Sequence, residues 1–475
     1  MRKESRTPTR PRRKRTSFQR VGTSMYRSLK PWDIFPPECI LGGVLLAMLV
    51  VACNTLGSHR EPNEVPTRNP RSEATIAASP VVTPLEISPE DVWQLWTNGT
   101  QLRGANIHQR RVYPELDGPV FMGPGPIGPP YVQDDFDQLA SLGANYVNLS
   151  HPGLFSERAP FEADPDVIAN LDRLLQMIER ADMFAVISFR TGPGRSEFTF
   201  MLEEVGTWFD RSYLNDSIWR DEAAQEAWIS MWRYTAERYR HHPIVVGYDL
   251  MVEPNANDAV VDVWDAELFY DAYAGTLLDW NQLHPRITEA IRQVDPTTPI
   301  LLGGMAYSAV EWMPYLLTND DEFTVYTFHQ YAPHVYTHQE WGLEMSAYPG
   351  WVDLDWDGME DPFDQAWLRV LLGPANAFRS DHDVPIAVNE FGVVRWVPGA
   401  ARFLQDEMEL FEQHGINYAV WAWEVRWEPY AQEVHAFNYL LGSDPNNRSI
   451  HLSNELITVL RAFWDLNLVR PSDFD

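Results

Sequence analysis

Residues 244–254 read IVVGYDLMVEP and residues 385–392 read PIAVNEFG, and these two stretches decide the fold. Each begins as a run of apolar and β-branched residues, which is typical of a buried strand, and each runs into a glutamate, Glu253 or Glu390. A carboxylate directly after a buried strand is costly unless it is paired or solvated. We therefore expect both glutamates to serve chemistry rather than packing.

Six further apolar runs of the same kind flank these two, and amphipathic stretches with helical spacing separate them. Eight strands that alternate with helices predict an α/β fold, a (β/α)8 TIM barrel over residues 89–475. A miscounted strand would permit an open, doubly wound sheet, but no GxGxxG follows the first strand. The predicted strands are LRGANIH (102–108), ANYVNLS (144–150), FAVISF (184–189), IVVGYDLM (244–251), PILLGGM (299–305), FTVYTFHQY (323–331), PIAVNEFG (385–392) and YAVWAWEV (418–425).

A TIM barrel carries its active site at the carboxyl ends of the strands, so the polar residues there are candidates. Glu253 follows the fourth strand and Glu390 ends the seventh, while the sixth adds His329 and Tyr331, which strand alternation aims to one side. Two carboxylates that face each other about 5–5.5 Å apart can hydrolyse a glycosidic bond with retention. This chemistry needs no cofactor and no catalytic metal.

The first 52 residues have the composition of a targeting segment. An apolar run of twelve residues, ILGGVLLAMLVV (40–51), follows a basic stretch and leads to Cys53. This pattern predicts a signal with a bacterial lipobox, in which Cys53 is lipidated; a short uncleaved anchor is the alternative. Met25 would give a more ordinary start. Residues 53–88, rich in Pro, Thr, Asn and Glu, predict a disordered linker, and we expect a secreted or cell-surface lipoprotein held to the membrane only through this N-terminus.

The charge of the chain restricts its partners. The net charge is −30, and eleven of the 37 Lys and Arg lie in residues 1–52, so the remainder is strongly acidic. An acidic surface repels phosphate backbones, which argues against nucleic acid as a partner. We expect a monomer. One motif, DLDWDGMEDPFD (Asp353 to Asp364), matches the opening of a calcium loop, and we expect either a structural calcium ion or an acidic surface insert there.

Five motifs resemble glycoside hydrolase family 5, the cellulase and mannanase family: RGANIH (103–108), GYDLMVEPN (247–255), FHQYAPHVYTHQEW (328–341), VNEFG (388–392) and VWAWE (420–424). The resemblance covers residues 89–468. It implies that Glu253 is the general acid/base and Glu390 the nucleophile. It also implies a hydrogen bond from Tyr331 to Glu390, a polar contact of His329 near the cleaved bond, and a sugar platform at Trp421 or Trp423. The implied substrate is a polysaccharide of the β-glucan or β-mannan type, cleaved internally.

Three positions depart from the family pattern. The Asn before the acid/base is Val252, the Arg of the second strand is Asn148, and the His near the third strand has no counterpart in ISFRTGPG (187–194). We expect Asn148 and His151 to contact substrate, and His151, Arg190 or Arg195 to replace the missing groups.

Two further expectations follow from this comparison. The charge of Glu390 is expected to keep Glu253 protonated at the working pH. The alternative function is a surface-anchored lipoprotein that binds carbohydrate through a degenerate, weakly active or inactive barrel.

Overall fold

A computed structural model describes residues 87–474 except 344, 355 and 356. The predicted signal segment and all but the last two residues of the predicted linker lie outside these residues. The described chain forms a closed barrel of eight parallel strands, so the predicted TIM barrel is confirmed, and each predicted strand run overlaps one of them. In chain order the strands are β1 (Arg103–His108), β4 (Tyr146–Pro152), β5 (Phe184–Thr191), β6 (Val245–Asp249), β7 (Ile300–Gly303), β8 (Thr324–Gln330), β11 (Ile386–Phe391) and β12 (Asn417–Val420).

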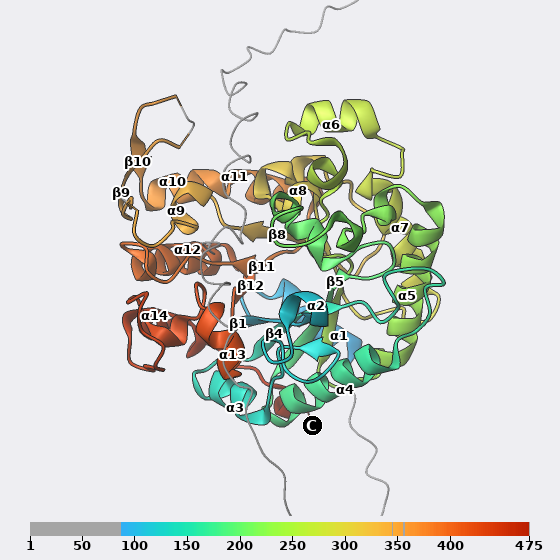
Figure 1. The fold of residues 1–475 in the computed structure, drawn as a ribbon, viewed down its shortest axis with the longest axis horizontal. Helices are drawn as coiled ribbons and strands as arrows, with labels where there is room; N and C mark the ends of the chain where they lie inside the picture. Colours follow the sequence, from blue (N-terminus) through green and yellow to red (C-terminus); the bar gives the residue numbers. More distant parts are fainter. Residues whose placement is uncertain (1–86, 344, 355–356, 475) are drawn as a thin grey trace, which may run out of the picture. The chain divides into compact units, whose positions relative to one another are not determined.

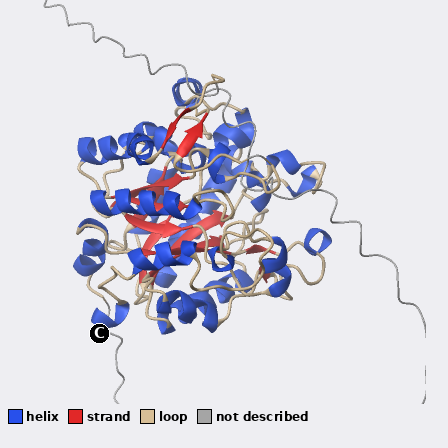
Figure 2. Ribbon diagram, turned by 90° about the vertical axis from the view of Figure 1, so that its left-hand side faces the viewer, coloured by secondary structure: helices blue, strands red, loops and turns tan. Residues whose placement is uncertain are grey.

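Helices surround the barrel, as Figures 1 and 2 show. Within the described residues no helix combines the length and the apolar character needed to span a membrane. The longer helices are α1 (Pro89–Thr97), α3 (Gln133–Ser141), α4 (Pro165–Arg180), α5 (Glu222–Tyr239), α6 (Ala266–Tyr273), α7 (Trp280–Arg292), α10 (Gln365–Leu371), α11 (Gly373–His382), α12 (Ala400–His414) and α14 (Glu455–Trp464). Shorter helices are α2 (Pro114–Asp117), α8 (Met305–Ser308), α9 (His334–Thr337) and α13 (Glu428–Glu433).

The sequence of α4 explains why such a helix forms and where it packs. Asp164 caps its amino end by accepting hydrogen bonds from the backbone amides of Asp166 and Val167, and Pro165 occupies the first helical position. The apolar residues recur at helical spacing and are buried, so one face of α4 packs against the barrel.

The amino-terminal end of the barrel is closed by α1. Leu95 and Trp96 are buried in an apolar cluster with residues from the starts of the strands, and the Trp96 indole donates a hydrogen bond to the carbonyl of Val246. On β1, a Cβ at Gly104 would lie 1.8 Å from the carbonyl oxygen of Tyr146, so only glycine allows β1 and β4 to pair. The interior is therefore packed, and ligands have access only at the opposite end.

Long connections cover the carboxyl end of the barrel. The segment after β1 contains the paired strands β2 (Arg110–Arg111) and β3 (Ile127–Gly128), and a second small sheet, formed by β9 (Gly350–Val352) and β10 (Asp361–Phe363), follows β8. Short 3-10 helices, η3 (Glu197–Phe200) to η6 (Ser217–Trp219), lie between β5 and α5. These segments surround the residues that end the barrel strands.

Candidate active site

Glu253, His329 and Glu390 meet at the mouth of the barrel. One side-chain atom of each lies within 4.8 Å of the others, and all three side chains are buried. His329 Nδ1 lies between the carboxylates, 2.9 Å from Glu253 Oε1 and 3.7 Å from Glu390 Oε2. The short separation of the carboxylates corresponds to the geometry of retaining rather than inverting glycosidases.

The backbone at Glu253 is held in an unusual conformation. Its φ angle is +54°, in the left-handed region that non-glycine residues seldom occupy. Arg195, fully buried, donates hydrogen bonds to the carbonyl oxygens of Val252 (2.6 Å) and Glu253 (2.5 Å), and to Asn255 Oδ1. Arg195 therefore fixes the turn that carries Glu253 and does not face the pocket. Strained backbone of this kind is common at functional sites.

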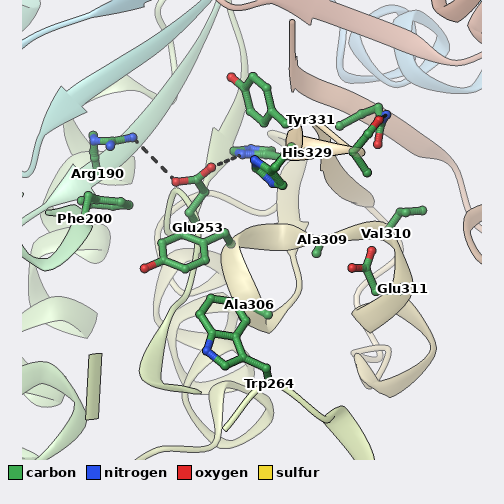
Figure 3. A pocket seen from close by; sticks show the side chains of 14 residues that line it. Arg190, Phe200, Glu253, Trp264, Ala306, Ala309, Val310, Glu311, His329 and Tyr331 are labelled. Carbon is green, nitrogen blue, oxygen red and sulfur yellow. Dashed lines mark hydrogen bonds and ion pairs between the residues drawn. The ribbon is translucent and has the colours of Figure 1, made fainter. Parts of the chain in front are cut away.

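Cations surround the Glu253 carboxylate. Besides His329, Arg190 Nη1 lies 3.9 Å from Glu253 Oε2, and Figure 3 shows Glu253 between these two partners. Burial alone would raise the pKa of Glu253, but the hydrogen bond from His329 and the charges of His329 and Arg190 outweigh burial and lower it. The expectation that Glu390 keeps Glu253 protonated is therefore wrong for the unliganded site.

Glu390 lies in different surroundings. The Tyr331 hydroxyl donates a hydrogen bond to Glu390 Oε1 at 2.8 Å, as the resemblance implies, whereas Oε2 has no hydrogen-bond partner within the described protein. Burial raises the pKa of Glu390 to about 7; the His329 charge opposes this rise and the Glu253 charge adds to it. Burial disfavours a charged His329, but the charge of Glu390 and the hydrogen bond to Glu253 raise its pKa to about 9. At neutral pH His329 holds a proton, and Glu390, with a pKa of about 7, is protonated part of the time.

A polar network in the barrel interior fixes the residue before Glu390. Asn389 Nδ2 donates to Asp249 Oδ2 at 2.6 Å, which links the strands β11 and β6. The carbonyl of Asn389 accepts hydrogen bonds from the side chains of Asn106 and Asn148, and Ser188 donates to Asn148 Oδ1. Burial raises the pKa of Asp249 to about 6.

Asn148, which we expect to contact substrate, belongs to this buried network. It pairs with Asn106 in the β1–β4 register, four residues before the end of β4, and is 1% exposed. It lies beneath the mouth and positions the backbone of β11.

Two other residues predicted to contact substrate, His151 and Trp423, have side chains that contact the surrounding helices. His151 alternates outward from the barrel, where its ring contacts the carbonyl of Pro152 and the side chain of Asn170 on α4. The Trp423 indole donates to the carbonyl of Asp135, and its ring lies beside Trp464.

Of the two predicted sugar platforms, only Trp421 lies on the site side. Its ring centroid is 5.7 Å from that of His108 and 6.0 Å from the guanidinium carbon of Arg190.

β5 and the segment that follows it add two charged side chains, Arg190 and Glu197, to the site. Arg190 is the second-last residue of β5 and points into the pocket, where its guanidinium carbon lies 3.6 Å from the centroid of the Phe200 ring. Arg190 Nε also donates to Glu197 Oε1 at 3.0 Å, and His108 Nε2 lies 3.5 Å from the same oxygen. The charge of Arg190 overcomes burial and lowers the pKa of Glu197 to about 2. Arg190 was foreseen from its place after a strand; Glu197 carries no sequence signal because it lies in an irregular loop.

A pocket opens beside Glu253 and extends over the ends of β6, β7 and β8 (Figure 3). The cavity itself is small, about 60 Å³. Trp264 and Tyr307 stack on one side with ring centroids 6.1 Å apart. Fourteen residues line it: Arg190, Phe200, Glu253, Trp264, Ala306, Tyr307, Ala309, Val310, Glu311, His329, Gln330, Tyr331, Ala332 and His334.

Two groups of side chains could be considered for metal binding. Among the described residues, the one converging set of three possible ligands is Glu253, His329 and Glu390. Because His329 carries a proton at neutral pH, this set is suited to proton transfer. In the predicted calcium loop, Asp364 caps α10, and Asp353 and Asp357 accept backbone hydrogen bonds within the β9–β10 turn. Asp355 lies outside the described residues, so calcium there stays a prediction.

A (β/α)8 barrel with two buried carboxylates facing each other at the carboxyl ends of its strands belongs to the class of barrel glycosidases. Comparison with known families agrees. The family described as Cellulase (glycosyl hydrolase family 5) matches residues 97–426. The chain belongs to this family and is a glycoside hydrolase. The family's chemistry needs no cofactor.

Individual relatives are distant. Endoglucanase C of Acetivibrio thermocellus is 24% identical over 317 residues, which cover 61% of this chain and 82% of the relative. Cellodextrinase A of Ruminococcus flavefaciens is 23% identical over 287 residues, 60% of this chain and 76% of the relative. The solved structure of endoglucanase Cel5A from Thermotoga maritima superposes with a TM-score of 0.53 at 17% identity, covering 79% of this chain and all of that chain. The structural similarity shows the barrel fold.

Proposed function

We propose that the protein is a retaining β-glycosidase that cleaves β-glucan chains by double displacement, with Glu390 as nucleophile and Glu253 as acid/base. One observation carries this proposal: two buried carboxylates approach to within 4.8 Å and hold a single histidine between them. Retaining enzymes need this short spacing because one carboxylate must reach the anomeric carbon directly.

The surroundings assign different roles to the two carboxylates. Glu390 Oε2 has no hydrogen-bond partner within the described protein and is the attacking atom, while Tyr331 orients Oε1. In the first step Glu390 bonds to the anomeric carbon, the bond to the leaving oxygen breaks, and Glu253 gives that oxygen a proton. In the second step water transfers a proton to Glu253 and its oxygen displaces Glu390 from carbon.

His329 supplies the proton that the first step consumes. Its Nδ1 donates to Glu253 at 2.9 Å and its pKa is about 9, so the His329–Glu253 pair holds one proton at neutral pH. In a coupled pair the proton belongs to both groups. When substrate displaces water, the developing charge on the leaving oxygen draws this proton through Glu253.

Arg190 supports an active enzyme rather than a degenerate binding protein. The family's second-strand Arg is replaced by Asn148, but Arg190 brings a guanidinium to the same two carboxylates from β5, and its charge acts on both. The charge of Arg190 thus opposes the rise in the pKa of Glu390 that burial causes.

The substrate class rests on the relatives and on the aromatic residues. Relatives bear the names endoglucanase and cellodextrinase, which favours β-glucan over β-mannan. Trp421 lies beside Arg190 and His108, where the ring of a bound sugar can stack.

The mechanism is tested by the stereochemistry of the first product and by trapping. Proton NMR during hydrolysis of an aryl β-glucoside or β-cellobioside is expected to show the β-anomer first. A 2-deoxy-2-fluoro glycoside with a good leaving group is expected to label one peptide, the one that contains Glu390. If the α-anomer appears first, or the label lies on another peptide, the double displacement assigned to these residues is wrong.

We also propose that the enzyme acts outside the cytoplasm, anchored by a lipid on Cys53. The apolar run of residues 40–51 directly before this cysteine supports this location. Wild-type protein is expected to fractionate with membranes and to incorporate labelled fatty acid, and Cys53→Ala is expected to lose both. Equal labelling of the two proteins would contradict the lipid anchor.

A further inference from the structure

Arg190 lies between two buried carboxylates and is closer to the one that takes no direct part in the double displacement. Its Nε donates a hydrogen bond to Glu197 Oε1 at 3.0 Å, whereas its Nη1 lies 3.9 Å from Glu253 Oε2, beyond hydrogen-bond distance. All three side chains are buried. A buried charge is costly, so the presence of Glu197 beside the site needs an explanation.

The segment that carries Glu197 is tied to the turn of the acid/base at two points. Glu197 begins η3, and Arg195, two residues earlier, donates a hydrogen bond to the carbonyl of Glu253. Asn255, two residues after Glu253, donates to the carbonyl of Thr199 within η3 at 3.0 Å. The position of Glu197 relative to Glu253 is therefore fixed by backbone contacts on both sides of Arg190.

Aromatic packing holds η3 in this position. The ring of Phe198 packs against those of Tyr113 and Phe209, with centroids 4.8 and 4.4 Å apart. The ring of Phe200 lies beside Arg190, as Figure 3 shows, with its centroid 3.6 Å from the guanidinium carbon. One short helix thus supplies both the carboxylate and the aromatic ring that hold the guanidinium.

Glu197 stays ionised because cations surround it. His108 Nε2 lies 3.5 Å from Glu197 Oε1, and the charge of Arg110, which is paired with Asp117, also reaches Glu197. Burial opposes ionisation of Glu197, but the charge of Arg190 and these two groups lower its pKa to about 2. Glu197 is therefore negative throughout the pH range in which the catalytic groups titrate.

The distance between Arg190 and Glu253 decides whether Glu253 can hold a proton. The charge of Arg190 lowers the pKa of Glu253 already at 3.9 Å, and Coulomb attraction in a buried site grows steeply as the distance shrinks. The other charged or titratable groups that act on Glu253 or on which its charge acts are Arg195, Tyr307, His329, Tyr331, His334 and Glu390. A guanidinium in direct contact would keep Glu253 ionised, and an ionised Glu253 has no proton for the leaving oxygen.

Resting on the function proposed above, we propose that Glu197 is a positioning residue for the acid/base. It binds Arg190 through Nε and keeps the guanidinium back from Glu253, so that Glu253 can take a proton from His329 and pass it to the leaving oxygen. Once Glu197 is neutral, Glu253 is the remaining carboxylate within 4 Å of Arg190 among the described residues. Arg190 is then drawn towards the acid/base.

The test replaces Glu197 in the full-length enzyme and compares two substrates. Glu197→Gln removes the charge and keeps an oxygen that can accept from Arg190. For cellotetraose, whose leaving group needs a proton, kcat/KM is expected to fall about 10- to 100-fold, part of the total that general acid catalysis contributes. For dinitrophenyl β-cellobioside, whose leaving group needs none, kcat/KM is expected to change less than about 3-fold.

The pH profile gives a second measurement. The alkaline limb of kcat/KM for cellotetraose is expected to move to lower pH by about one unit in Glu197→Gln, because loss of a negative charge lowers the pKa of the His329–Glu253 pair. Glu203→Gln, exposed on η4 (Leu202–Glu204) of the same segment, is the matched control and is expected to change neither substrate nor profile. An equal loss on both substrates with an unmoved alkaline limb in Glu197→Gln would overturn the inference.

Glu197→Asp carries the test if Glu197→Gln does not fold, which thermal unfolding followed by circular dichroism detects. It keeps the charge but shortens the reach to Arg190, so the same selective loss is expected at a smaller size. An equal loss on both substrates in this variant would again overturn the inference.

A double-mutant cycle tests whether Glu197 acts through Arg190. In an Arg190→Met background, Glu197→Gln is expected to have little further effect on cellotetraose, because no guanidinium remains to be held. A full effect in this background would overturn the role assigned to Glu197 while leaving the proposed function intact. No cleavage of any substrate by wild type would overturn the proposed function, and this inference with it.

Discussion

The two halves of the barrel mouth present their carboxylates in opposite ways. Glu253 lies at an open pocket, on a strained turn, with His329 and Arg190 beside it. Glu390 lies on β11, with one neutral donor, Tyr331, and one oxygen without a hydrogen-bond partner within the described protein.

The surroundings give two chemically identical side chains different pKa values. Cations lower the pKa of Glu253, and burial raises that of Glu390 to about 7, so the environments separate two groups with the same intrinsic chemistry. Between them, His329 carries the mobile proton. Four variants test this difference between Glu253 and Glu390.

The largest effect is expected from Glu390→Ala. Without the nucleophile no glycosyl-enzyme forms, so kcat is expected to fall on the order of 10⁴-fold or more on every substrate. Added azide is expected to restore part of the rate and to give the glycosyl azide of inverted configuration. A glycosyl azide of retained configuration from this variant would indicate that Glu390 is the acid/base and Glu253 the nucleophile.

Glu253→Ala is expected to discriminate between substrates. General acid catalysis contributes about 10²- to 10⁴-fold, so oligosaccharides with poor leaving groups are expected to lose about that factor. An activated aryl glycoside still forms the covalent intermediate, whose breakdown then limits the rate, and a burst of phenol measures this. An equal loss on both substrates would contradict the role of proton donor.

His329→Gln is expected to change the pH profile more than the maximal rate. In wild type kcat/KM is expected to fall below about pH 7, as Glu390 gains a proton, and above about pH 9, as His329 and Glu253 lose theirs. Without the His329 charge the pKa of Glu390 rises. The alkaline limb then depends on Glu253 alone, so kcat/KM begins to fall below pH 9. Both limbs should move inward, with about a tenfold lower maximum. Unchanged limbs would show that His329 holds no catalytic proton.

The smallest effect is expected from a change in the pocket beside Glu253. Trp264→Ala removes one face of the aromatic pair with Tyr307. KM for oligosaccharides is expected to rise about 3- to 10-fold, the usual worth of a stacking contact, without loss of kcat. A β-glycosyl fluoride, whose leaving group is too small to reach this pair, serves as control substrate, and Trp351→Ala, exposed on β9, as control variant. A similar rise in KM for the fluoride would contradict a contact between Trp264 and the leaving part of the substrate.

Strand alternation explains the directions in which the predicted site residues point. His329 and Tyr331 point to the same side because β8 is regular as far as Gln330. Trp423 is turned away because β12 ends at Val420, so alternation no longer applies beyond it. His151 is still within β4 but on its outer face. Alternation in the sequence predicts the direction of a side chain only within the length of the strand.

The sequence alone determined the barrel, its eight strands and the two glutamates at strand ends, because strand periodicity and the cost of a buried charge act locally along the chain. Only the tertiary structure decided the rest: Arg190 beside Glu253, Arg195 on the turn at Glu253, and the network around Asn389. These contacts join segments that are far apart in sequence. The distances between the groups in these contacts set the pKa values of the site, and no local sequence pattern encodes such distances.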